Sequence, residues 1–101
     1  MSVVELTYHG HACFSVAVDD TQLLIDPFLT GNELADISAD QVEADYILVS
    51  HGHGDHVGDT VAIAQRTGAM TISNFEIHNW LLEQGVESAQ QLHIGGGYDF
   101  P

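Results

Sequence analysis

The sequence predicts a layered α/β fold, and three features of its pattern support that prediction. The first part of the chain is rich in β-branched and aromatic runs, which are typical of strands. From residue 45 onward, strand-like and helix-like segments alternate, as they do in folds whose helices pack on a sheet. The apolar runs 23–25 and 46–49 are nearly continuous, which favours strands buried on both faces.

Three strands are predicted in the first part of the chain, over residues 3–8, 13–18 and 22–26. Asp19 and Asp20 suit the turn of a hairpin between the second and third of these strands. Pro27 ends the third strand, because proline cannot donate a hydrogen bond to a sheet. Residues 27–44 are expected to form a loop, with or without a short helical turn, before a further strand over residues 46–50.

The first helix is predicted from Asp59 to Thr67. Asp59 is its expected N-cap, and Gly68 lies just past its end, where glycine commonly terminates a helix. A short strand over residues 70–72 is expected to follow.

The second helix is predicted to begin near Ser73, which has the spacing of a capping box to Glu76. Its apolar residues recur at the i, i+3 and i+4 positions that form one face of a helix, namely Ile77, Trp80 and Leu81. Gly85 is expected to end this helix.

Length and composition fit one small domain or part of a larger one, with 101 residues of which 45% are hydrophobic. No run approaches the ~20 apolar residues of a membrane span. The N-terminal residues 1–5 lack the basic and apolar regions of a secretory signal. A single cysteine, Cys13, excludes an internal disulfide and fits a reducing compartment, so we expect a cytoplasmic location.

The charge balance is strongly acidic, because 15 acidic residues face the single basic residue Arg66 and give a net charge of −14. Such a chain repels phosphates, so we expect neither nucleic acid nor a membrane among its partners. Loss of lysine with retained acidic residues suits a salt-adapted surface, since salt screens self-repulsion. The alternative is that a partial chain carries a skewed sample of a more balanced surface.

The segment HGHGDH, residues 51–56, predicts a metal site on a loop after a strand. Alternate residues of an extended segment project the same way, so His51 and His53 can reach one metal together. Asp55 and His56 follow a further glycine, where the chain can turn and offer them to a second metal. Imidazole and carboxylate suit zinc, iron and similar ions. The alternative is a polar, pH-sensitive loop that binds no metal.

Four segments together resemble a known superfamily of hydrolases. HGHGDH matches the HxHxDH signature of the metallo-β-lactamase superfamily. Three further segments are similar to the UPF0173 metal-dependent hydrolases, relatives of the ascorbate-6-phosphate lactonase type: YHGHACF at 8–14, LIDPFLTG at 24–31 and IGGGYDF at 94–100. The similarity covers nearly the whole chain. It implies that residues 1–101 are a partial domain, the N-terminal half of a four-layered αββα sandwich that starts β-rich and continues as βαβα.

The resemblance also implies roles for individual residues. His51 and His53 would bind the first metal, and Asp55 and His56 the second, with Asp55 also orienting or deprotonating the nucleophilic water. Asp26 would support the metal ligands from behind, as an outer partner of their imidazoles; an ordinary turn aspartate is its alternative reading. His11 would lie at the mouth of the site as a second catalytic residue, in contact with metal-bound water or substrate.

The implied function is a metal-dependent hydrolase that activates water at a mono- or dinuclear site. Zinc is the expected ion, one or two per site, with manganese or iron as alternatives. The superfamily's later histidine, bridging aspartate and final histidine have no counterpart in this chain, so we expect the chain alone to be inactive. Its expected partners are a small-molecule substrate and either a second copy or a complementary C-terminal half.

Two other function classes stay open. One is a non-catalytic metal-binding or interaction fragment, and the other is a di-iron redox protein on the same fold. His53 argues against the redox class, because its members carry glutamate at that ligand position. A reading frame that continues beyond this segment with a histidine, an aspartate and another histidine would favour the hydrolase.

Five further residues are expected to be structural or peripheral. Cys13 and Trp80 are expected in the core, and His78 beside the apolar face of the second helix. His9 is expected to face solvent. His93 precedes a glycine run, and the sequence gives no argument that it reaches the site.

Overall fold

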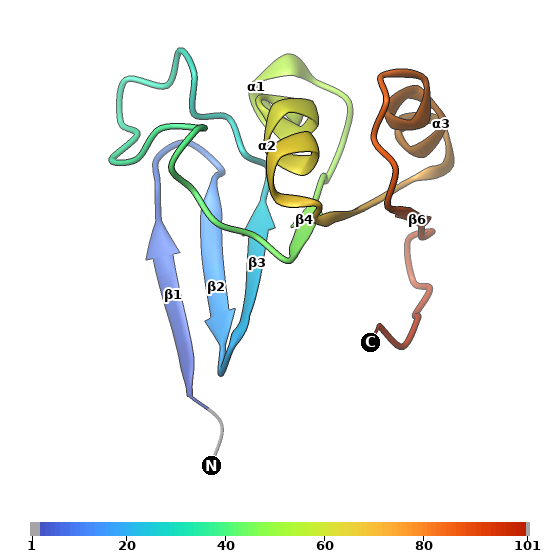
Figure 1. Cartoon of the computed structure of the whole chain (residues 1–101), viewed down its shortest axis with the longest axis horizontal. Coiled ribbons are helices and arrows are strands. Elements are labelled where there is room, and N and C mark those ends of the chain that lie inside the picture. The colour runs from blue at the N-terminus through green and yellow to red at the C-terminus, as the bar shows by residue number, and fades with distance from the viewer. Residues whose placement is uncertain (1–2, 101) are drawn as a thin grey trace.

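The computed structural model describes residues 3–100 and contains one six-stranded sheet and three helices in that range (Figure 1). The strands are β1 (Val4–Tyr8), β2 (Phe14–Val18), β3 (Thr21–Ile25), β4 (Tyr46–Leu48), β5 (Met70–Ser73) and β6 (Ala89–Gln91). The helices are α1 (Gly54–Val57), α2 (Thr60–Thr67) and α3 (Phe75–Glu83). The predicted α/β class is confirmed, whereas α1 and β6 were not predicted from the sequence.

The sheet follows the order of the chain, from β1 to β6. The pairs β1–β2 and β2–β3 are antiparallel, while β3–β4, β4–β5 and β5–β6 are parallel. The hairpin between β2 and β3 has the predicted two-residue turn, since Val18 pairs with Thr21. Asp19 takes a positive φ of 52° there, a conformation that aspartate tolerates better than most residues.

The core lies on the helical face of the sheet. Leu24 of β3 and Ile47 of β4 are fully buried there, and Ile63 of α2 and Leu81 of α3 are fully buried in the same cluster. Cys13 is also fully buried in this cluster, which confirms its predicted core position. Burial of these side chains supplies the main drive for docking the helices.

The other face of the sheet is only partly covered, so the prediction of strands buried on both faces is wrong for this chain. Leu23 and Leu48 project to this face and are half-buried. The C-terminal segment reaches one part of it, where the ring of Phe100 lies 5.5 Å from the ring of Tyr46. The apolar residues are those of a strand covered on both faces, but the described chain covers one.

The helix ends differ in detail from the predicted caps. Gly68 follows α2 in the left-handed conformation, as predicted. Asp59 occupies the N-cap position of α2, but its side chain makes no capping hydrogen bond. For α3 the N-cap is Asn74 and not Ser73, because the Asn74 Oδ1 accepts a hydrogen bond from the Ile77 backbone N–H at 2.9 Å. The strand before α3 therefore extends through Ser73.

The long loop between β3 and β4 contains no regular element, as predicted. Arg66 of α2 ties it down, since its guanidinium donates hydrogen bonds to the carbonyl oxygens of Ala39, at 2.9 Å, and Val42. Within residues 3–100, none of the helices is both long and apolar enough to cross a membrane.

Candidate metal centre

Three chain segments meet at one end of the sheet (Figure 1). They are the turn after β1, the loop after β3 and the HGHGDH segment after β4. The carboxyl ends of β3 and β4 lie side by side because these strands are parallel neighbours, and β1 runs in the same direction. This geometry brings residues 11, 26 and 51–56 together although the sequence separates them, at the sheet edge where α/β proteins commonly bind ligands.

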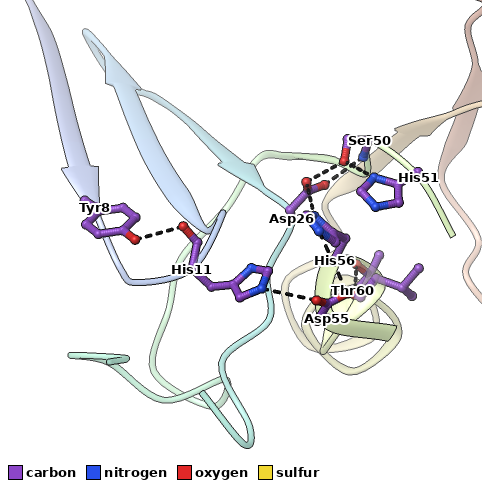
Figure 2. A network of polar contacts seen from close by, with 9 residues as sticks. Tyr8, His11, Asp26, Ser50, His51, Asp55, His56 and Thr60 are labelled. Carbon is purple, nitrogen blue, oxygen red and sulfur yellow. Dashed lines mark hydrogen bonds and ion pairs between the residues drawn. The ribbon is translucent and has the colours of Figure 1, made fainter. Parts of the chain in front are cut away.

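Asp26 lies at the centre of a polar network at this end (Figure 2). Its side chain is buried, and its backbone takes a positive φ of 46°. The backbone N–H of Ser50 donates to Oδ1 at 2.7 Å, and the Ser50 hydroxyl donates to Oδ2 at 2.5 Å. The Nδ1 atom of His56 lies 2.9 Å from the same Oδ2. A carboxylate accepts hydrogen bonds only, so His56 donates from Nδ1 and keeps the lone pair of Nε2.

Ser50 extends the network to His51. Its hydroxyl lies 2.8 Å from Nδ1 of His51, and it already donates its proton to Asp26. His51 must therefore donate from Nδ1, which leaves the lone pair on its Nε2. Figure 2 shows the rings of His51 and His56 close together, with centroids 3.9 Å apart. One buried carboxylate thus sets the orientation and the tautomer of two imidazoles, as outer partners of metal ligands do.

His11 approaches the network from the other side. Its Nε2 lies 3.1 Å from Oδ2 of Asp55, and its ring centroid lies 5.2 Å from that of His56. It also packs edge-on against Phe28, at 5.6 Å between ring centroids. The structure therefore brings His11 to Asp55 and His56, where the resemblance placed it at the mouth of the site.

Two groups of side chains have the spacing of a metal site. The first is His11, Asp55 and His56, and the second is Asp26, His51 and His56. In each group the ligand atoms lie within 4.8 Å of one another. Imidazole nitrogen and carboxylate oxygen form the donor set that zinc and similar divalent ions accept, so these residues fit a metal. Asp26 of the second group already accepts hydrogen bonds from Ser50 and His56, which suits an outer partner of the ligands.

His56 belongs to both groups, whereas His53 belongs to neither. The His53 ring does lie next to that of His51, with centroids 4.7 Å apart. The pairing of His51 with His53 on one metal, and of Asp55 with His56 on another, stays a prediction.

Helix α1 carries Asp55 and His56, and the loop after β3 holds it in place. At Gly58, just after α1, an added Cβ would lie 2.5 Å from the carbonyl oxygen of Pro27, so only glycine allows this approach. Asp59 then binds the same loop, since its Oδ2 accepts hydrogen bonds from the backbone N–H groups of Leu29 and Thr30, at 3.0 and 2.8 Å. Asp59 was predicted only as a helix cap, and its contact with this loop was not predicted.

The remaining candidates divide between correct and incorrect predictions. Burial and the nearby negative charge of Asp26 raise the pKa of the Cys13 thiol to about 12, so it is a poor nucleophile. His9 was expected to face solvent, but its side chain is buried against Asp36 and Ser15. Trp80 was expected in the core, but it is 42% exposed.

The other two histidines lie outside both donor groups. His78 is half-buried on α3, and its Nδ1 is buried without a hydrogen-bond partner in the described chain. His93 is exposed, and together with Ser50 it lines a hollow of about 540 Å³ beside the HGHGDH segment. Ile25 and Leu48 form part of its apolar lining.

Comparison with known proteins identifies the family. The profile of the Beta-lactamase superfamily domain matches residues 5–99, which is nearly the whole described chain. The chain belongs to this superfamily. Its fold is therefore the N-terminal half of the metallo-β-lactamase fold, as the sequence predicted.

Similar curated proteins are named UPF0173 metal-dependent hydrolases. One from Carboxydothermus hydrogenoformans is 56% identical over 97 residues, and one from Shouchella clausii is 52% identical over 97 residues. Each alignment covers 96% of this chain but 42% of the relative. The chain thus spans about two-fifths of the length of the curated relatives it matches.

Two solved structures illustrate the range of the fold. Igni18, a metallo hydrolase from Ignicoccus hospitalis, superposes with a TM-score of 0.85 at 36% identity, over 95% of this chain and 42% of that one. The diiron β-hydroxylase CmlA from Streptomyces venezuelae superposes with a TM-score of 0.70 at 24% identity, over 88% of this chain and 20% of that one. The second likeness shows the fold alone.

Proposed function

We propose that this chain provides the metal-binding half of a metal-dependent hydrolase active on a small molecule. The observation that carries the proposal is the network centred on Asp26, which is buried and fixes His56 directly and His51 through Ser50. Both imidazoles keep their Nε2 lone pairs, and that of His56 lies 3.8 Å from Oδ1 of Asp55. A buried carboxylate that orients two histidines in this way supports the proposal of a metal site, because outer partners orient metal-binding imidazoles in the same manner.

The chain's own residues would divide the work at such a site. A bound divalent ion, zinc in the first instance and manganese or iron otherwise, supplies a water of lowered pKa. His51, His53, Asp55 and His56 would hold one or two such ions. Asp55 is exposed at the mouth of the site, where its carboxylate can orient that water or take its proton. His11 lies beside it and would contact the water or the substrate.

The site needs further groups for catalysis. Catalytic zinc has three protein ligands and an open position, and the pair His51 and His53 supplies two. We propose that the remaining ligands come from a complementary C-terminal half, because this chain matches only 42% of the length of each of these curated relatives. The hollow that Ser50 and His93 line would then receive part of a small-molecule substrate. We retain a cytoplasmic location as the expectation from the single cysteine.

The experiment compares the wild-type protein, expressed from the whole reading frame, with His51→Ala. Metal content is measured by mass spectrometry, and hydrolysis is measured with bis(4-nitrophenyl) phosphate and with a simple lactone. We expect the wild type to bind a divalent metal and hydrolyse one of these probes. His51→Ala should lose metal and activity together, because one oriented imidazole is gone.

Two results would contradict the hydrolase proposal. Wild-type rates in the His51→Ala protein would remove His51 from the site. Metal-dependent oxygen consumption without hydrolysis would favour the di-iron redox alternative, and metal binding without either reaction would favour a non-catalytic module. A His93→Ala protein is the matched control for metal binding, since His93 lies outside both donor groups.

A further inference from the structure

We propose that His11 is a direct metal ligand, and that His11, Asp55 and His56 form a three-residue metal site lying entirely within this chain. The inference rests on the proposed function, which requires that the HGHGDH segment binds metal. It goes further, because His11 lies outside that segment and was expected only to contact water or substrate. It also predicts that the chain needs no complementary half to hold its first ion.

The first support is the geometry of the donor atoms. His11 Nε2 lies 3.1 Å from Asp55 Oδ2, and one ligand atom from each of His11, Asp55 and His56 lies within 4.8 Å of the others. Two imidazoles and a carboxylate supply three ligands and leave a fourth position open to water. That is the usual arrangement of a catalytic zinc ion, whereas Asp55 and His56 alone supply two ligands.

The second support is the strain in the turn that presents His11. His11 has a positive φ of 57°, which is uncommon for any residue other than glycine. The Tyr8 hydroxyl donates to the His11 carbonyl oxygen at 2.8 Å (Figure 2). The Cys13 N–H donates to the Gly10 carbonyl oxygen at 3.0 Å and closes the turn. Such a conformation persists where its surroundings enforce it, and it occurs frequently at functional sites.

The third support is a contact that anchors the turn from behind. His9 has 5% of its surface exposed, and its two ring nitrogens lie 2.6 Å from Asp36 Oδ1 and 2.6 Å from Ser15 Oγ. The Asp36 carboxylate can only accept, so His9 donates to it from Nδ1. This contact also lowers the pKa of Asp36 below its ordinary value, which keeps the carboxylate charged.

The contact between His9 and Asp36 joins the turn to the long loop between β3 and β4. The same loop packs on Gly10, where an added Cβ would lie 2.6 Å from Cβ of Leu34. The backbone of the turn is thus fixed on three sides, by the loop, by β2 through Ser15 and by the Tyr8 hydroxyl. His9 and Asp36 are therefore positioning residues, which act on a metal through His11.

The test measures metal binding by the 101-residue chain itself, with Zn²⁺ and Co²⁺ as the probes. The informative variant is His11→Asn, because asparagine removes the imidazole yet tolerates the positive φ of this turn. Calorimetric titration of the chelator-treated chain gives the affinity, and the visible spectrum of bound Co²⁺ reports the number and type of ligands. His93→Asn is the control, as an exposed histidine outside both donor groups.

We expect His11→Asn to weaken Zn²⁺ binding by about 100-fold or more. Removing an outer partner of a ligand already weakens metal binding by about 10- to 100-fold, and removing a direct ligand should cost at least as much. The Co²⁺ spectrum should change as one nitrogen ligand is lost, while His93→Asn matches the wild type in both measurements. Wild-type affinity and an unchanged Co²⁺ spectrum in His11→Asn would overturn the ligand assignment and leave the proposed function intact. A wild-type chain that binds no metal would overturn this inference, while the whole protein could still satisfy the proposed function.

The positioning role has its own matched pair of variants, Asp36→Asn and Asp40→Asn. Both carboxylates lie exposed on the same loop, and each has a pKa lowered by a side-chain hydrogen bond, from His9 and from Ser38 respectively. We expect Asp36→Asn to weaken Zn²⁺ binding about 10-fold and to alter the Co²⁺ spectrum. Asp40→Asn should do neither, because the hydrogen bond between Asp40 and Ser38 stays within the loop, whereas that of Asp36 joins the loop to the turn. Equal Zn²⁺ affinities in the two variants would refute the role of Asp36.

Discussion

The two faces of the sheet differ in what covers them and in what they carry. On the helical face Leu24, Ile47 and Thr71 are fully buried under the helices and the long loop. On the opposite face Leu23 and Leu48 are half-buried, and Leu6 at the β1 edge is 64% exposed. The same strands form both faces, so the difference lies in the cover and not in the hydrophobicity of the residues.

The distribution of charged residues also distinguishes the open face of the sheet. The chain has a net charge of −14, yet the strand positions on the open face carry no charged residue. They are Val4, Leu6, Tyr8, Phe14, Val16, Val18, Thr21, Leu23, Ile25, Tyr46, Leu48, Met70, Ile72 and Gln90. A surface selected for contact with water would share in the acidic charge. The open face thus has the composition of an interior, in keeping with the proposed C-terminal half as its cover.

The largest expected difference between the faces is in stability. Leu24 and Leu23 are adjacent in β3 and project to opposite faces. Leu24→Ala should lower the free energy of unfolding by about 2–5 kcal/mol, because it leaves a cavity in the core. Leu23→Ala should cost about 1 kcal/mol or less, since water already reaches that side chain. Urea denaturation of the two variants measures the difference, and equal losses would show that the open face is packed like the core.

Thiol chemistry is the next probe of the covered side. Burial raises the pKa of Cys13 from 9.0 to about 12, so the folded chain holds roughly 1000-fold less thiolate than the unfolded chain at pH 8. Iodoacetamide should therefore label Cys13 quickly in urea and very slowly in buffer. Rapid labelling of the folded chain would contradict its burial.

The same shift makes stability depend on pH. The pKa of Cys13 is higher in the folded chain than in the unfolded chain. Its contribution to the free energy of unfolding is therefore complete below pH 9.0 and is lost as the pH rises toward about 12. Urea titrations at a series of alkaline pH values measure this loss. A Cys13→Ala chain is the control, since the part of the pH dependence that comes from the thiol should vanish in it.

Salt should stabilise the acidic surface by a smaller amount. Screening in 1 M KCl, where the Debye length is about 3 Å, removes most repulsion between exposed carboxylates. We expect the melting temperature of the chain to rise by about 5 °C, which corresponds to about 1 kcal/mol for a domain of this size. A melting temperature that is flat or falls from dilute buffer to 1 M KCl would contradict a surface dominated by acidic repulsion.

The smallest expected effect is at the edge of the open face. Leu6→Gln should change the free energy of unfolding by no more than about 0.5 kcal/mol, because this side chain is mostly in water. It should also weaken self-association of the chain, which sedimentation velocity measures at increasing concentration. A large loss of stability would mean that Leu6 is covered in solution.

The sequence predicted the local parts of this structure well. The strands before Pro27 and the helix before Gly68 follow from short-range patterns, and the HGHGDH segment follows a strand as expected. Helix α1 escaped prediction because four residues are too few to show a helical period. Strand β6, with the sequence AQQ, has little strand propensity of its own and forms by pairing with β5.

Only part of the candidate site was predicted, because sequence patterns report local structure and the remaining residues make long-range contacts. The HGHGDH motif is local, and the roles of Asp26 and His11 were predicted from the resemblance to the superfamily. Ser50, Asp59 and Asp36 were missed as site-building residues, because their contacts join positions 24, 30 and 27 residues apart. No periodicity reports a hydrogen bond of that range. The one available sequence signal was that Ser50 is a polar residue directly before a candidate ligand, His51.

Equilibrium dialysis of the chain against Zn²⁺ tests the central claim most directly, with the wild type and His56→Asn compared. His56 is shared by both donor groups, and Asp26 fixes its orientation. The structure predicts that the wild type binds Zn²⁺ and that His56→Asn binds it about 100-fold more weakly or worse. Equal binding by the two chains, at unchanged helix content, would contradict a metal centre at this end of the sheet.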